Sequence, residues 1–242
     1  MPVIARSLSI GLGVSIVAIV IVVAFFVSDF DMSKNEKSPN TLLQPENMDQ
    51  TKGGGSKIDL SLFSSKATTL LGSPSATVTL VEFGDYQCFH CNRFFHTIEP
   101  GIEKNYIDTK KVKMIFKDFT IIGQDSINAA HATHCAQEVG KFWEFHDTLY
   151  NNWTGENNGW ASPSNISGFA MQLGLDEEGF KSCMSDGRYV SVIKASYSDA
   201  KTLGLTGTPG FFIIGPDNSI TKISGAQPYE VFEEIFNSKL EK

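Results

Sequence analysis

The sequence lacks an excess of positive charge, because its 20 Lys and Arg residues are outnumbered by 27 Asp and Glu residues. The formal charge of −7 argues against nucleic-acid binding, which normally requires a basic face. No long internal repeat is detectable in the 242 residues. Cysteine is scarce, but the four residues form an even number, which permits complete pairing in an oxidising compartment.

Apolar residues are abundant, and 18 Phe residues with a hydrophobic content of 41% exclude a disordered chain. The part of the chain that follows residue 57 has about 185 residues, which is enough for one domain with a substantial core. We therefore expect a single folded domain over residues 58–242.

The N-terminal segment has no charged residue from Ser7 to Ser28. As a helix, its apolar part would span about 30 Å, roughly the thickness of a bilayer core. Arg6 precedes the segment, which predicts a cytoplasmic N-terminus and an extracytoplasmic remainder. We expect a single-pass transmembrane anchor in residues 1–28; a cleaved signal peptide is the alternative, but the exit Ala24–Asp29 offers no small-x-small cleavage site.

Residues 29–57 are polar and contain Pro39, Pro45 and the run from Gly53 to Ser56. This composition is typical of a flexible linker. We expect the linker to hold the folded domain near the membrane surface.

The first half of the domain shows a strand–helix–strand pattern. Residues 77–83 and 112–116 are apolar and β-branched, as in buried strands. Between them an apolar helix face extends to about residue 108, and Pro100 should interrupt that helix. The face comprises Cys91, Phe94, Phe95, Ile98 and Ile102. These elements predict a βαβ unit with parallel strands.

The second half begins with a helical block, for which we expect helices from Asp125 to Gly140 and over 142–150, 164–173, 176–184 and 189–203. The first of these helices should carry an apolar stripe of Ala132, Cys135, Ala136 and Val139. Strands at 211–214 and 219–223 flank a turn at Gly215–Asn218, and Pro228 begins a last helix. The order predicts an α/β fold in which a helical block, about 124–204, is inserted into a mixed sheet.

The motif Cys88-Phe89-His90-Cys91 lies between the first strand and the following helix. Backbone N–H groups and the dipole at a helix start favour a thiolate at Cys88, which is the form that attacks disulfides. Cys91 lies one turn later and should be the more buried, resolving thiol. A structural disulfide or half of a zinc site are the alternatives.

Glu82 interrupts a strand that is otherwise apolar. A carboxyl group there should be partly desolvated with a raised pKa, and it could take and return the Cys91 proton. The alternative is a carboxylate at a strand end, solvated or paired with a lysine. Asp85 is expected to be a loop or capping residue.

The chain resembles the thioredoxin-fold thiol–disulfide oxidoreductases of the DsbA type. The resemblance rests on the run from Val81 to Cys91, on Lys117-Asp118-Phe119, on residues 129–145 with Cys135 and Lys141-Phe142-Trp143, and on Gly207-Thr208-Pro209. It implies a thioredoxin fold, a mixed central sheet flanked by helices, with an inserted all-helical subdomain. It also implies a redox-active Cys88–Cys91 disulfide that needs neither metal nor organic cofactor.

The resemblance assigns roles to further residues. It implies a cis Pro209 that faces the active site and leaves the Thr208 backbone free to pair with a substrate chain; an ordinary trans proline is the alternative. His90 should tune the thiolate, while Phe89 stands where many members carry proline and also affects the redox potential. The resemblance further implies a structural disulfide between Cys135 and Cys183, with two free thiols or a second redox pair as alternatives.

A metal site formed by His131, His134 and Cys135 is conceivable because the two histidines lie three residues apart, but no clear fourth ligand exists unless Cys183 joins. We expect surface or packing roles for both histidines. The expected protein is therefore metal-free.

Three functions remain open from the sequence. The first is an extracytoplasmic disulfide oxidase that acts on reduced or unfolded proteins and is reoxidised by a membrane partner of the DsbB or vitamin-K-epoxide-reductase type. The second is an isomerase or reductase on the same fold, although such proteins often dimerise through an added domain that this chain does not show. The third is a non-enzymatic, membrane-tethered chaperone or binding module. We expect a monomer in each case.

Overall fold

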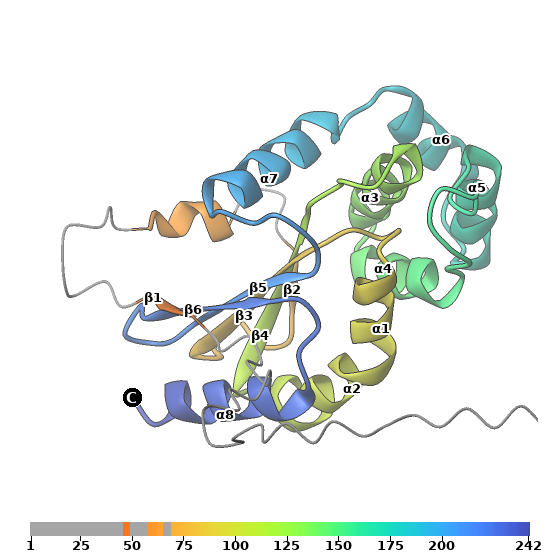
Figure 1. The fold of residues 1–242 in the computed structure, drawn as a ribbon. Helices are drawn as coiled ribbons and strands as arrows, with labels where there is room; N and C mark the ends of the chain where they lie inside the picture. Colours follow the sequence, from red (N-terminus) through yellow and green to blue (C-terminus); the bar gives the residue numbers. More distant parts are fainter. Residues whose placement is uncertain (1–45, 49–57, 65–68) are drawn as a thin grey trace, which may run out of the picture. The chain divides into compact units, whose positions relative to one another are not determined.

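The computed structural model describes residues 46–48, 58–64 and 69–242 (Figure 1). These residues contain a six-stranded mixed sheet in the order β1-β6-β5-β3-β4-β2. The strands are β1 (Glu46–Met48), β2 (Leu70–Leu71), β3 (Val78–Gly84), β4 (Val112–Asp118), β5 (Gly210–Ile214) and β6 (Ile220–Ser224).

The centre of the sheet carries the predicted βαβ unit. β3 runs parallel to β4, in a register that pairs Val78 with Val112 and Gly84 with Asp118. On its other side β3 pairs antiparallel with β5, so that Glu82 lies opposite Phe211. The central position of β3 explains its apolar sequence, because both faces of the strand are covered.

Helices cover both faces of this sheet (Figure 1). They are η1 (Leu60–Phe63), α1 (Phe89–Thr97), α2 (Glu99–Ile102), the π-helical turn η2 (Glu103–Ile107), α3 (Gln124–Gln137), α4 (Phe142–Asn151), α5 (Pro163–Gln172), α6 (Glu177–Ser185), α7 (Val190–Thr202) and α8 (Tyr229–Leu240). Val78 and Leu80 of β3 pack with Phe94 and Phe232 on the face of α1 and α8. Val81 and Phe83 are turned to the opposite face, toward α7 and η1.

The helix after the cysteine motif is interrupted where proline predicts it. α1 ends at Thr97, Ile98 has a non-helical backbone, and α2 begins at Glu99 with Pro100 in its first turn. Proline is tolerated there because its missing N–H has no partner within the first turn. The break directs Glu99 inward, where it is buried.

The inserted block comprises α3 to α7, residues 124–202, and agrees with the predicted insertion at about 124–204. Two consecutive residues at the end of β4 attach the block to the sheet. Lys117 donates to Asp199 of α7 at 2.6 Å and to the Leu62 carbonyl oxygen at 2.6 Å. The Asp118 carboxylate lies 2.7 Å from His134 Nε2 of α3.

Two sequence predictions are wrong in detail. Residues 46–48 of the predicted linker, 29–57, form strand β1 on the edge of β6, because an unpaired strand edge can accept any extended segment through backbone hydrogen bonds. Val139 is 61% exposed, since α3 ends at Gln137 and the stripe ends with it. The short strand β2 was not predicted.

The predicted membrane anchor, residues 1–28, lies outside the described residues and stays a prediction, as does the rest of the linker. Among the residues that are described, no helix has the length and apolar character needed to cross a membrane.

Candidate active site

Cys88 and Cys91 lie where β3 passes into α1. Cys88 is the N-cap residue of α1, and Cys91 lies in its first turn. Both are free thiols, and both are buried, with 5% and 1% of their surface exposed. Cys88 is thus the more exposed of the two, as the sequence predicts, but only by a small margin.

The surroundings of Cys88 stabilise its thiolate. Side-chain hydrogen bonds with Cys91 and Thr208 and the backbone N–H groups of Cys91 and His90 together outweigh burial and lower the pKa of Cys88 from 9.0 to about 6. The N–H groups are those of a helix start, which have no partner within the helix. At neutral pH Cys88 is therefore largely a thiolate.

Cys91 has the opposite environment. Burial raises the pKa of the Cys91 thiol well above its ordinary value, and the hydrogen bond and charge of Cys88 raise it further. The two sulfurs of one motif thus differ in their affinity for a proton. The dithiol form carries one thiolate and one thiol.

This asymmetry predicts how the stability of the reduced protein depends on pH. Between about pH 6 and pH 9 the folded chain has lost the Cys88 proton, while the unfolded chain keeps it. The reduced form should gain stability as the pH rises through this window and lose it as the pH falls to about 6, by at most about 1.4 kcal/mol per pH unit. Thermal unfolding of the reduced and oxidised forms from pH 5 to pH 9 measures this.

The oxidised form is the internal control, because a disulfide does not titrate. The free-energy difference between the two forms should therefore change with pH. A difference that is constant across the window would contradict a lowered pKa at Cys88.

The segment around Pro209 lies against the cysteine motif. The Thr208–Pro209 peptide bond is cis, so the trans alternative does not hold. The Cys88 sulfur lies 3.4 Å from the Thr208 carbonyl oxygen, and the Pro209 carbonyl oxygen accepts from the Gly225 N–H at 2.9 Å. This segment also lines a cavity of about 350 Å³. The lining consists of residues 204–210 together with Lys222, Ser224 and Gly225.

The two residues between the cysteines face outward. Phe89 is 51% exposed, and its N–H donates to Glu156 Oε1 at 3.1 Å. The His90 side chain is also exposed, and its ring packs against Phe89. The backbone N–H of His90 helps to lower the pKa of Cys88, and tuning of the thiolate by the imidazole stays a prediction.

Glu82 lies fully buried on the α1 face of β3. Burial raises the pKa of its carboxyl group well above the ordinary value, and the charge of Cys88 adds to this. Its Oε2 has no hydrogen-bond partner, so neither a solvated nor a lysine-paired carboxylate describes it. Burial therefore favours the protonated form of this carboxyl group, which can exchange a proton with a neighbouring group.

Asp85 is a loop residue, as expected from the sequence. Its carboxylate accepts hydrogen bonds from the N–H groups of Gln87, Ile121 and Ile122, which joins the loop before Cys88 to the loop after β4. Trp153 donates to the Gln87 carbonyl oxygen at 2.8 Å from the helical block. These bonds fix the approach to the helix start.

The second pair of cysteines forms a bond. Cys135 of α3 and Cys183 of α6 are joined with an S–S distance of 2.03 Å, which is the pairing implied by the resemblance. The His131 ring lies beside this bond, but oxidised sulfurs are not metal ligands. His134 has the structural role expected of it, through Asp118.

A thioredoxin family model matches residues 64–237, which is most of the chain. The chain belongs to the thioredoxin family. The match includes both cysteine pairs, Glu82 and the Thr208–Pro209 segment.

Similar proteins of this family carry names that refer to disulfide chemistry. The disulfide bond formation protein D of Bacillus subtilis is 28% identical over 151 residues, 61% of this chain and 68% of that protein. A Rickettsia typhi protein with protein-disulfide oxidoreductase in its name is 28% identical over 165 residues. This alignment covers 65% of the chain but 59% of the relative, so the chain spans less than two thirds of that protein's length.

Solved structures share the fold. Oxidised BdbD from Bacillus subtilis superimposes with a TM-score of 0.67 and 26% identity, over 74% of this chain and 96% of that one. The α-DsbA1 protein of Wolbachia pipientis gives a TM-score of 0.65 at 24% identity, over 75% and 94% of the two chains. The thioredoxin fold with its helical insertion is therefore that of DsbA proteins.

The sequence reasoning did not identify several residues near the site. Tyr150 interacts electrostatically with Cys91, Tyr86 and Glu99 interact with Glu82, and the Glu156 carboxylate accepts from the N–H of Phe89. For Glu99 a signal existed, because it lies four residues after Phe95 on the predicted apolar helix face. An acidic residue on an apolar helix face predicts a buried carboxyl group, just as Glu82 does in the apolar strand.

Proposed function

We propose that the protein is a thiol–disulfide oxidoreductase that acts as a disulfide oxidase outside the cytoplasm. The observation that carries this proposal is the opposite displacement of the two cysteine pKa values, down at Cys88 and up at Cys91. A stabilised thiolate stabilises the reduced enzyme, which makes its disulfide a stronger oxidant. The names of the relatives support the same chemistry.

In the proposed reaction a client thiolate attacks the Cys88 sulfur of the oxidised enzyme. The Cys88–Cys91 bond breaks, Cys91 leaves with the electron pair and takes a proton, and a mixed disulfide joins Cys88 to the client. A second client thiolate then attacks the client sulfur, and Cys88 leaves as a thiolate. The client gains one disulfide and the enzyme gains two electrons and one proton, while the second proton passes to solvent.

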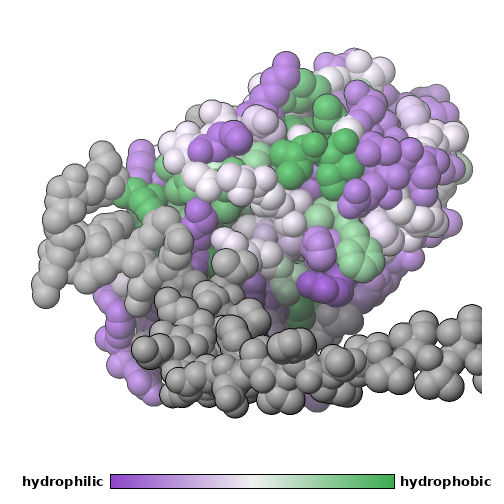
Figure 2. Space-filling view, viewed as in Figure 1, coloured by the Kyte–Doolittle hydropathy of each residue, from purple (hydrophilic) through white to green (hydrophobic). Residues whose placement is uncertain are grey.

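The surface around the motif suits unfolded clients. Phe89, Ile121 and Ile127 expose large apolar side chains on the segments that surround Cys88. Figure 2 shows hydrophobic surface between α7 and α3 on the face that it draws. The Thr208 carbonyl oxygen, 3.4 Å from the Cys88 sulfur, offers a backbone acceptor to an extended client segment. Roles for Phe89 and Thr208 in client contact follow from these positions.

Reoxidation completes the proposed cycle. A quinone-linked membrane oxidase with its own disulfide, of the DsbB or vitamin-K-epoxide-reductase type, would accept two electrons from the Cys88 thiolate and Cys91. The predicted anchor in residues 1–28 would hold the domain near that partner, on the extracytoplasmic side. In this proposal the chain itself uses only its own cysteines, and any quinone belongs to the membrane partner.

The reduction potential of the Cys88–Cys91 pair tests the direction. Equilibration of the full chain against glutathione mixtures should give a value near −120 mV, as for the strongest protein oxidants. The lowered pKa of Cys88 is the physical reason, since each 30 mV corresponds to about 1.4 kcal/mol of stabilisation of the reduced form.

A potential near −270 mV, as in thioredoxin, would contradict the oxidase and favour a reductase on the same fold. A chain that carries Cys135→Ala and Cys183→Ala should give the same potential. This control assigns the measured value to the Cys88–Cys91 pair.

A further inference from the structure

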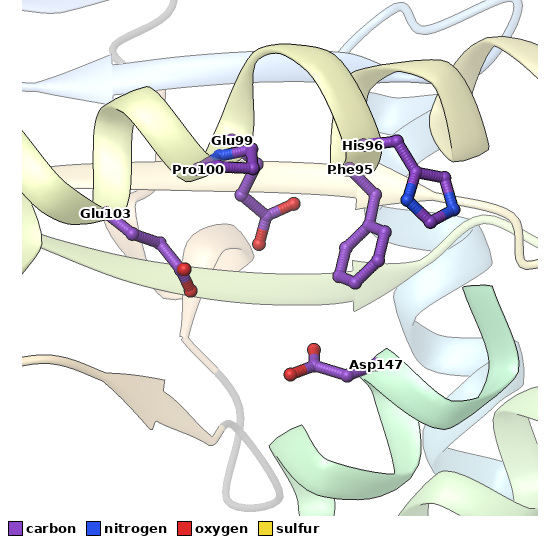
Figure 3. A pocket seen from close by; sticks show the side chains of 6 residues that line it. All are labelled: Phe95, His96, Glu99, Pro100, Glu103 and Asp147. Carbon is purple, nitrogen blue, oxygen red and sulfur yellow. The ribbon is translucent and has the colours of Figure 1, made fainter. Parts of the chain in front are cut away.

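Behind the cysteine motif lies a cavity of about 140 Å³ that is bounded by α1, α2, η2 and α4. It is lined by Phe95, His96, Glu99, Pro100, Glu103 and Asp147. Figure 3 shows the carboxylates of Glu99, Glu103 and Asp147 pointing toward a common space from two sides. Three acidic groups thus meet at a hollow that opens to solvent.

Glu99 differs from the other two acids because it is buried. It is 3% exposed, and its Oε2 has no hydrogen-bond partner. Burial, and then the charges of Glu82, Glu103 and Asp147, raise the pKa of its carboxyl group well above the ordinary value. Glu99 is therefore electrostatically coupled both to the carboxyl group below the cysteines and to the acids at the cavity.

Tyr150 of α4 adds a hydroxyl group to this interior. The hydroxyl is fully buried without a hydrogen-bond partner. After burial itself, the groups that raise its pKa are Cys91, Glu82, Tyr86 and Glu99. The Tyr150 hydroxyl thus lies in the electrostatic neighbourhood of the resolving thiol and of both buried carboxyl groups.

Partnerless buried polar groups are rare and require a reason. Here Glu82 Oε2, Glu99 Oε2 and the Tyr150 hydroxyl group lack partners among the described residues. A proton passes between such groups along a hydrogen bond that is direct or made through one water, and a carboxyl oxygen with no fixed partner is free to form one. Tyr150 interacts with Cys91, and Glu99 lines the cavity.

We propose that Glu99 is a positioning residue that passes protons between Glu82 and the cavity lined by Glu103 and Asp147, and so supplies the Cys91 proton from solvent. This inference rests on the proposed thiol–disulfide exchange and adds the route of its proton. Glu99 does not touch the reacting sulfurs and acts through Glu82.

The protons balance in both half-reactions. When a client thiolate breaks the Cys88–Cys91 bond, the Cys91 thiolate takes a proton from Glu82, Glu82 takes one from Glu99, and Glu99 takes one from cavity water. During reoxidation the Cys88 thiolate attacks the disulfide of the oxidising partner. Glu99 then gives its proton to cavity water and takes the proton of Glu82. Cys91 gives its proton to the resulting Glu82 carboxylate and attacks Cys88, and the partner thiolate leaves.

Other titratable groups lie beside this route, and two of them are histidines. His146 is buried, burial lowers its pKa, and its Nδ1 lies 3.0 Å from Asp147 Oδ1. His96 Nε2 lies 3.3 Å from the Tyr150 carbonyl oxygen at the cavity. The groups that face the two glutamates are Tyr86, Cys88, Cys91, His96, Glu103, His146, Asp147 and Tyr150.

The test compares the full chain with a Glu99→Gln variant. Because burial raises the pKa of Glu99 and so favours its neutral form, and because Gln has nearly the same shape, the variant should fold with an unchanged thermal midpoint. The oxidised proteins are mixed with increasing dithiothreitol, and Trp fluorescence follows reduction. The variant should reach a plateau rate roughly 100-fold below the wild-type rate at the same dithiothreitol concentration, at the lower end of the range of positioned proton transfers.

Three readouts separate a proton route from a structural disturbance. The plateau of Glu99→Gln should show a larger solvent deuterium isotope effect than the wild type. In Glu99→Ala, which leaves room for a small acid beside the cavity, formate should restore the rate. Glu99→Asp should keep an isotope effect close to that of the wild type. Glu234→Gln, an exposed change of the same kind on α8, should react as the wild type does.

A Glu99→Gln variant with the wild-type rate and isotope effect would overturn the proposal. A slow Glu99→Gln variant with an unchanged isotope effect, together with a Glu99→Ala variant that formate does not rescue, would also overturn it. A wild-type chain that exchanges with dithiothreitol but fails to oxidise a reduced client contradicts the proposed direction alone. The comparison of variants then still decides the route, since Cys91 must exchange its proton in either direction.

Discussion

A Cys88→Ser variant is expected to lose thiol–disulfide exchange by roughly 10³-fold or more while it keeps its fold. The serine hydroxyl has nearly the shape of the thiol and would retain the position 3.4 Å from the Thr208 oxygen, but it forms no disulfide. Losses of this size are seen when other enzymes lose their nucleophile. The measurement is the oxidation of a reduced peptide with two cysteines by stoichiometric enzyme.

A Cys91→Ser variant is the matched control. It keeps the Cys88 thiolate but lacks the resolving thiol, so it should accumulate a mixed disulfide with the peptide, visible by mass. If Cys88→Ser still oxidised the peptide, the proposed nucleophile would be wrong. If it lost oxidation but kept the ability to hold unfolded protein in solution, a chaperone activity would exist beside the redox activity.

Removal of the second cysteine pair is expected to have the largest effect on stability. A chain with Cys135→Ala and Cys183→Ala lacks the bond that joins α3 to α6 across 48 residues. In the chain-entropy model, a loop of this length stabilises the folded state by about 4 kcal/mol. Denaturant unfolding of both proteins, with Cys88 and Cys91 in the same redox state, measures the loss.

Cys88→Ala with Cys91→Ala provides the comparison for this experiment, because it removes the other two cysteines and retains the bond of the helical block. This chain should keep most of the wild-type free energy of unfolding. Equal losses in the two double variants, or no loss without the Cys135–Cys183 bond, would show that the bond does not hold the block together. Peptide oxidation should survive in the chain that lacks it.

Much of the fold follows from the order of sequence patterns. The β-branched runs before Cys88 and after residue 111 gave β3 and β4, and Pro100 gave the break between α1 and α2. The strands β1 and β2 were not predicted, because three and two residues are too few to show the alternation of apolar and polar residues that marks a strand. Their positions depend on sheet edges with free hydrogen-bonding groups, which are a property of the folded sheet.

The part of the site that lies in one short segment of the chain could be predicted from the sequence. The motif of Cys88 and Cys91 and the acidic residue in the strand, Glu82, were visible as departures from local pattern. The contact of Thr208 with Cys88 joins residues 120 positions apart, and only the resemblance to a family implied it. Glu99 was missed because its meaning depends on the cavity and on Tyr150, both of which exist only after α4 packs against α1.

The attachment of the helical block bears on how clients reach Cys88. Lys117 and Asp118 are neighbours at the end of β4, yet one holds the last helix of the block and the other holds the first. Because successive strand residues point to opposite faces, this dipeptide fastens the block on both sides of the sheet. Movement of the helical block relative to the sheet would have to break the Lys117–Asp199 and Asp118–His134 contacts together. We therefore expect the block to keep a fixed position relative to the sheet. Under the proposed function, the fit of an extended client segment to a rigid surface beside Cys88 would then decide which clients react, without any hinge motion.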